Sequence, residues 1–191
     1  MSVAGIILAA GESRRMGFPK AMLRYREETF LDTLIGLLSP HCSPVIVVLG
    51  AHADRIRENT VRAATFVHNF DYQRGMTTSL QCGLRAVPDQ ADSVLFTLVD
   101  HPAVSAATIK SLLAVPAPVL RVPRHGGRRG HPIWFSRELI SEFLQLPETG
   151  AARDVVHAHA ADTQFLDLDD SGIVADIDDP VAYGRLTGAP L

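Results

Sequence analysis

A loop of small and basic residues follows the first apolar segment of the chain. Residues 8–20 read Leu-Ala-Ala-Gly-Glu-Ser-Arg-Arg-Met-Gly-Phe-Pro-Lys. The residues at 9–11 have little or no side chain, so their backbone N–H groups can approach a phosphate closely. Arg15 and Lys20 add positive charge that would stabilise a reacting triphosphate. The loop therefore predicts triphosphate binding, and the alternative is a polar connection whose basic residues are solvated.

Two better-known phosphate-binding loops do not occur in the sequence. It contains no G-x-x-x-x-G-K-[ST] and no G-x-G-x-x-G. A P-loop ATPase and a dinucleotide-binding Rossmann site are therefore not expected. The sequence also indicates no histidine metal site, because His157 and His159 are two apart on an expected helix and point to different sides.

Aspartates that follow apolar segments are candidate ligands for Mg²⁺. Asp100 ends the apolar run 93–99, and the carboxyl end of a central strand faces the ligand side of an open α/β sheet. Mg²⁺ needs only one or two carboxylates besides phosphate oxygens and waters. Asp176 and Asp178 would share a face on a strand, so spacing does not separate them. The alternatives are a helix cap at Asp100 and a solvated helix N-terminus at the second pair.

Two further segments could contact the substrates. Gly75 precedes an expected helix, whose free N–H groups can meet an anion or a base carbonyl. The alternative is that Thr77 or Thr78 simply caps that helix. Residues 121–132 concentrate arginine, histidine and glycine, which suits a loop that closes on an anionic acceptor. A solvated hairpin is the alternative, above all for Arg128 and Arg129. The basic residues of this segment are Arg121, Arg124, His125, Arg128, Arg129 and His131.

The elements that must position these residues indicate a three-layer α/β/α fold with a doubly wound, mostly parallel sheet. Apolar runs without alternation are typical of strands buried on both faces. They span residues 3–8, 44–49, 64–67, 93–99 and 119–122. Helical patterns span residues 29–38, 77–86, 105–113, 136–144 and 152–160. The β-α alternation predicts a doubly wound, Rossmann-like fold whose ligand site lies at the carboxyl edge of the sheet.

Composition favours a single domain over residues 1–191. Hydrophobic residues make up 47% of the chain, enough for a continuous core. The net charge of −3 gives no general electrostatic footprint for nucleic acid or for a membrane. Only Cys42 and Cys82 are present, so a reducing, cytoplasmic setting is expected. The first apolar segment is too short for a signal peptide or a membrane span.

The loop at 8–20 resembles the signature L-A-[AG]-G-x-S-x-R-M-G-x-x-K of the nucleotidyltransferases that complete the molybdenum cofactor. Their superfamily includes sugar-phosphate and alcohol-phosphate nucleotidyltransferases. The resemblance extends through residues 69–80, 97–102, 130–135 and 176–183. The Leu-Ala-Ala-Gly form and the Gly-His-Pro segment look more like the cytidylyl-transferring branch than the guanylyl-transferring one. The chain departs from the family pattern with Asp179 in place of Thr and Ala182 in place of Asp.

The resemblance implies a specific reaction. CTP would donate CMP to the phosphate of molybdopterin carrying molybdenum, with Mg²⁺ as cofactor and a molybdenum hydroxylase as a partner. Expected catalytic residues are Arg15, Lys20 and Asp100. The expected nucleotide site comprises Leu8, Ala9, Ala10, Gly11, Ser13, Arg15, Lys20, Asn69, Gly75 and Ser79. The expected acceptor site comprises His101, Gly130, His131 and Arg153, and the metal ligands are Asp100, Asp176 and Asp178.

Other functions stay open from the sequence. A superfamily transferase could use GTP, or another acceptor such as a sugar phosphate or an alcohol phosphate. A module that only binds and delivers a nucleotide or cofactor belongs to a different class, and the presence of Arg15, Lys20 and Asp100 argues against it. Pyrophosphate release with a panel of acceptors would distinguish these functions.

Overall fold

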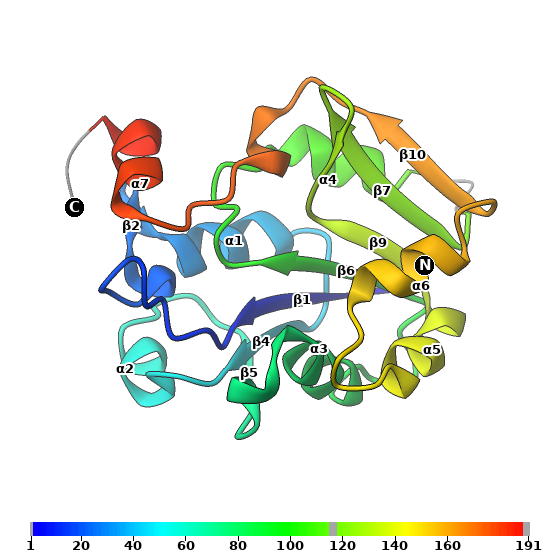
Figure 1. Ribbon diagram of the computed structural model, residues 1–191, viewed down its shortest axis with the longest axis horizontal. Coiled ribbons are helices and arrows are strands. Elements are labelled where there is room, and N and C mark those ends of the chain that lie inside the picture. The colour runs from blue at the N-terminus through cyan, green and yellow to red at the C-terminus, as the bar shows by residue number, and fades with distance from the viewer. Residues whose placement is uncertain (1, 115–117, 189–191) are drawn as a thin grey trace.

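The computed structural model describes residues 2–114 and 118–188, and its sheet lies between two layers of helices (Figure 1). In this described part, an eight-stranded sheet has the order β10-β7-β9-β6-β1-β4-β5, and β8 pairs with β7. The strands are β1 (Val3–Ala9), β4 (Val45–Leu49), β5 (Thr65–His68), β6 (Ser93–Leu98), β7 (Leu120–His125), β8 (Arg128–Arg129), β9 (Ile133–Ser136) and β10 (Thr163–Asp167). A separate small hairpin joins β2 (Arg24–Tyr25) to β3 (Glu28–Thr29).

Two of the helices begin with side-chain caps at Thr29 and Ser105. Thr29 Oγ1 accepts a hydrogen bond from Asp32 N, and Ser105 Oγ accepts one from Thr108 N. The α-helices are α1 (Phe30–Leu38), α2 (Ala53–Glu58), α3 (Met76–Arg85), α4 (Ala106–Leu112), α5 (Ile140–Gln145), α6 (Ala152–Ala158) and α7 (Pro180–Thr187). Short 3-10 turns are η1 (Lys20–Met22), η2 (Tyr72–Arg74), η3 (Arg137–Leu139) and η4 (Ser171–Val174). Within the ranges described, no helix has the length and apolar character needed to span a membrane.

The sheet confirms the predicted mostly parallel, doubly wound architecture. Strand β1 pairs in parallel with both β4 and β6, and β5 and β10 also join the sheet in parallel. Strand β9 is antiparallel to both of its neighbours, β6 and β7. The carboxyl ends of β1, β6 and β7 therefore point to the same edge, where the predicted site residues follow them.

One helix prediction is wrong at its start, and the strands β9 and β10, like the two-residue strands β2, β3 and β8, were not expected. Ser136 belongs to β9, where it pairs with Ser93, and its N–H donates to Val119 O. Ser136 is therefore the last residue of a strand, and α5 begins only after the turn η3. Strand β10 was missed because it lies at the sheet edge, where its residues are only partly buried.

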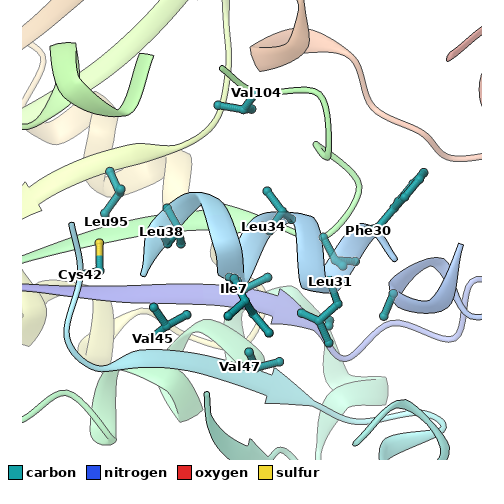
Figure 2. Close-up of a cluster of buried hydrophobic side chains, with 14 of the residues drawn as sticks. Ile7, Phe30, Leu31, Leu34, Leu38, Cys42, Val45, Val47, Leu95 and Val104 are labelled. Carbon is teal, nitrogen blue, oxygen red and sulfur yellow. The ribbon is translucent and has the colours of Figure 1, made fainter. Parts of the chain in front are cut away.

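Hydrophobic side chains fill both faces of the sheet. Along β1, Ile7 packs on the face covered by α1 and α4, whereas Ile6 packs on the face covered by α3, α5 and α6. Figure 2 shows α1 lying along the first of these faces, with Ile7 and Val47 beneath it. The central strands are thus held rigidly on both sides, which fixes the loops that leave their carboxyl ends.

Candidate active site

The loop after β1 is held by its own backbone and by a serine side chain. Ser13 O accepts hydrogen bonds from Met16 N at 3.0 Å and from Gly17 N at 3.1 Å. Ser13 Oγ accepts a further bond from Lys20 N at 3.0 Å. Met16 is buried, which anchors the middle of the turn in the core. The loop therefore turns back on itself and brings Lys20 to the carboxyl edge of the sheet.

Lys20 joins carboxylates from two distant segments of the chain. Its Nζ lies 2.7 Å from Asp100 Oδ2 and 2.8 Å from Asp178 Oδ1. Arg15 Nη2 lies 2.7 Å from the other oxygen of Asp178, while most of the Arg15 side chain is exposed. The structure therefore brings together four of the predicted catalytic and metal residues.

The charges in this cluster stabilise one another. Burial lowers the pKa of Lys20, but Asp100 and Asp178 outweigh that effect, so the pKa is raised overall. The hydrogen bond from Lys20 is the main reason that the pKa of Asp178 is lowered, against the opposing effect of burial. Lys20 and Asp178 are therefore both ionised at neutral pH.

Asp176 and Asp178 do not share a face, which corrects the expectation that spacing cannot separate them. They lie in irregular backbone rather than on a strand. Between them, Ile177 is buried and its N–H donates to Asp100 O at 3.0 Å. The two carboxylates diverge, so that Asp178 reaches Lys20 while Asp176 Oδ1 lies 3.0 Å from His101 Nε2.

His101 lies behind Asp100 rather than in a substrate cavity. Its side chain is 2% exposed, and its Nε2 lies 3.7 Å from Asp100 Oδ1. It lines neither the cavity that Lys20 and Asp100 line nor the cavity that Gly130 and His131 line. The structure therefore does not bring His101 to the predicted acceptor site, and its nearest carboxylate is that of Asp176.

The first cavity has a volume of about 240 Å³ and lies against the loop and the Lys20 cluster. It collects most of the predicted nucleotide residues. Its lining includes Leu8, Ala9, Ala10, Gly11, Ser13, Lys20, Gly75, Ser79 and Asp100. It also includes residues that the sequence did not indicate, among them Tyr72 and Met76 on either side of Gly75. Their nearness to Gly75 along the chain was the available signal.

Asn69 supports this cavity from behind instead of lining it. Its Nδ2 donates to Thr78 Oγ1 and to Ser79 Oγ, each at 2.9 Å. Neither threonine caps α3 as the alternative supposed, because Thr78 Oγ1 donates to Gly75 O and Thr77 Oγ1 donates to Gly150 O. Gly75 itself has a φ of +123°, a conformation that L-residues rarely adopt.

The second cavity has a volume of about 300 Å³ and collects three of the four predicted acceptor residues, Gly130, His131 and Arg153. The remaining lining is mostly apolar, with Arg129 as a further cation. The other lining residues are Met76, Thr77, Leu80, Phe96, Val122, Ile133, Ala151, Ala152 and Val156.

Gly130 and His131 are fixed by the turn η4. His131 N donates to Ile173 O at 2.9 Å, and a Cβ at Gly130 would lie 2.2 Å from the same oxygen. Burial lowers the pKa of His131 to about 4, and nearby His101 acts in the same direction. His131 is therefore neutral at pH 7, so positive charge in this cavity comes from arginines.

The basic segment is a short hairpin, and Arg121 is not part of its exposed surface. Arg121 is 3% exposed, donates to Leu112 O and Gln164 Oε1, and stacks over the Trp134 ring. Its place on β7 and its aromatic neighbour explain the burial, so its inclusion in the basic loop predicted to close on the acceptor was wrong. Arg128 and Arg129, which form β8, are exposed.

The cluster fits a divalent metal that binds together with phosphates. Asp100 Oδ1 is buried and has no hydrogen-bond partner among the described residues. Asp178 adds a second carboxylate on the other side of Lys20. No group of three or more His, Cys, Asp or Glu side chains in the described part of the chain could hold a metal ion. The two aspartates nevertheless suffice for Mg²⁺, whose remaining ligands are commonly phosphate oxygens and waters.

Comparison with known proteins agrees with this geometry. The sequence profile of the MobA-like NTP transferase domain matches residues 5–163. The molybdenum cofactor cytidylyltransferase of Escherichia coli (strain K12) is 30% identical over 177 residues, which cover 92% of this chain and 90% of that protein. A probable molybdenum cofactor guanylyltransferase of Mycolicibacterium paratuberculosis is 30% identical over 183 residues, which cover 93% of this chain and 91% of that protein.

Solved structures show the same similarity. Rv0371c from Mycobacterium tuberculosis H37Rv has a TM-score of 0.87 and 30% sequence identity, over 99% of this chain and 98% of that one. Its complex with manganese has a TM-score of 0.82 and 28% identity, over 99% of this chain and 100% of that one.

Proposed function

The chain belongs to the family of MobA-like NTP transferase domains, and we propose that it transfers CMP from CTP to the phosphate of molybdopterin carrying molybdenum. Pyrophosphate is the second product. The observation that carries the proposal is the position of Lys20, between Asp100 and Asp178 and on the wall of a cavity formed by the small-residue loop. That arrangement offers cations, metal-binding carboxylates and backbone donors to one triphosphate.

In the proposed reaction an oxygen of the acceptor phosphate attacks the α-phosphorus of the nucleotide. A new P–O bond forms while the bond to the bridging oxygen breaks, and pyrophosphate leaves in line. The backbone at residues 9–11 would orient the phosphates in the first cavity. Lys20 Nζ, which neutralises two carboxylates in the free protein, would turn to the phosphates of the bound nucleotide.

Asp100 and Asp178 are the proposed ligands of Mg²⁺. Asp100 Oδ1 has no hydrogen-bond partner among the described residues, and the Asp178 oxygens could exchange their ion pairs for a metal ion. Carboxylate oxygens suit a hard cation. The manganese complex of Rv0371c supports a divalent ion in a similar protein. When bound, the ion would screen the repulsion between the two anionic substrates. Asp176 is the weaker candidate, because its carboxylate faces His101.

Cytosine is the proposed base, and two observations favour it. The similarity to the Escherichia coli cytidylyltransferase spans 92% of the chain. Ala10 lines the nucleotide cavity and replaces the second glycine that the guanylyl-transferring branch usually has. The equal identity to a guanylyltransferase makes GTP the second candidate. Replacing Ala10 with glycine should then relax discrimination against GTP, by about 1–3 kcal/mol at most for one methyl group.

The second cavity is the proposed binding site for the acceptor. Its apolar walls would receive a flat ring system, while Arg129 and Arg153 would attract a phosphate. The product of this reaction would be passed to a molybdenum hydroxylase, which is the proposed partner.

Pyrophosphate release tests the proposed function. The four nucleoside triphosphates are supplied in turn, with Mg²⁺, and with or without molybdopterin. Release that requires both CTP and molybdopterin is the expected result. Release with GTP but not CTP would favour the guanylyl alternative, and no release with any nucleotide would contradict a transferase.

A further inference from the structure

We infer that Met76 is a wall shared by both substrates and couples their binding, an inference that rests on the proposed function. Among the described residues, Met76 lines both the nucleotide cavity and the acceptor cavity. Its neighbours divide between the two cavities, because Gly75 and Ser79 line the first whereas Thr77 and Leu80 line the second. The first turn of α3 therefore separates the cavities, and Met76 belongs to both.

The exposure of Met76 differs sharply from that of its neighbours. Its side chain is 58% exposed, whereas Thr77, Ser79 and Leu80 are 6%, 4% and 1% exposed. A large apolar side chain gains free energy when a ligand covers it. Either substrate would cover one side of Met76, and both together would cover most of it.

The backbone under Met76 is fixed while its side chain is adaptable. Gly75 supplies the φ of +123° from which α3 begins. Thr77 Oγ1 is tied to Gly150 O on the acceptor side, and Ser79 Oγ is tied to Asn69 on the nucleotide side. The methionine side chain has three rotatable bonds and a polarisable sulfur, so it can follow the shape of a ligand.

Coupling follows from this combination. The first substrate to bind orders the methionine side chain, so the second meets a wall that is already in place. By thermodynamic linkage each substrate then raises the affinity for the other by the same factor. Met76 thereby favours the ternary complex, in which the acceptor phosphate lies next to the α-phosphate.

The test compares Met76→Ala, Met76→Leu and wild type, with Val61→Ala as the control. Val61 is 85% exposed and lines neither cavity, so its truncation removes an exposed apolar side chain without touching either substrate. The first readout is the KM for CTP and for molybdopterin. The second is the Kd of a non-hydrolysable CTP analogue, measured with and without molybdopterin, whose ratio is the coupling factor.

Met76→Ala should raise both KM values by about 15-fold, the effect of losing two contacted methylene-sized groups. Its coupling factor should fall to about 1, while Met76→Leu and Val61→Ala keep the wild-type factor. An unchanged coupling factor in Met76→Ala, or a change in only one KM, would overturn the inference while wild-type turnover leaves the proposed function standing. Wild type that releases no pyrophosphate with CTP and molybdopterin would contradict the proposed function itself.

Discussion

Acidification should destabilise this protein through His131. Burial lowers the pKa of His131 to about 4 from an ordinary value of 6.5, and His101 contributes in the same direction. The unfolded chain therefore binds the proton first as the pH falls. The contribution of neutral His131 to stability is complete above pH 6.5 and is lost as the pH falls through that value towards about 4.

The size of the effect follows from the two pKa values. Between pH 7 and pH 5, proton linkage predicts that His131 alone removes about 2 kcal/mol from the free energy of unfolding. Urea unfolding at both pH values measures this for wild type and for His131→Gln. Glutamine does not titrate, so the variant should lose about 2 kcal/mol less than wild type over the same interval.

A matched control separates this effect from general acid sensitivity. His157 is an exposed histidine of α6, and His157→Gln should keep the pH dependence of the wild type. Only the change in the free energy of unfolding between pH 7 and pH 5 is compared, because His131→Gln can also change stability at pH 7 through packing. Equal pH dependence in His131→Gln and wild type would refute the assignment of a neutral, partly buried His131.

Three further predictions concern the site. Lys20→Ala should lower turnover by on the order of 10²–10³ in a variant whose circular dichroism is unchanged, and near-normal turnover would exclude its role with the phosphates. Asp178→Asn should weaken the response to Mg²⁺ in a metal titration, whereas Asp176→Asn should leave the half-saturating concentration unchanged; the opposite pattern would exchange their roles. Gly130→Ala should lower the free energy of unfolding, measured with urea, by about 1–3 kcal/mol because its Cβ would meet Ile173 O. An unchanged free energy of unfolding would show that η4 can move away from the added Cβ.

Much of the site could be predicted from the sequence because strand ends determine it. The small-residue loop and Asp100 follow buried parallel strands, and such strands end at one edge of the sheet. The loop residues and Asp100 therefore meet at one cavity. The predicted roles of these residues in binding and catalysis stay predictions.

Contacts between residues that are far apart in the sequence could not be predicted. The hydrogen bond from Ile177 N to Asp100 O decides that Asp178, and not Asp176, turns to Lys20. No local pattern encodes that contact. Arg121 was grouped with the other basic residues of 121–132 because it is near them in the sequence, yet Trp134 and nearby backbone carbonyls give it buried partners.

Competition between CTP and GTP tests the central claim most directly. The wild-type protein is supplied with both nucleotides at equal concentration, together with Mg²⁺ and molybdopterin carrying molybdenum. Mass spectrometry then identifies the dinucleotide product. A product that carries mainly CMP is the predicted result. A product that carries mainly GMP would contradict the base assignment, and the absence of any dinucleotide would contradict the proposed transfer.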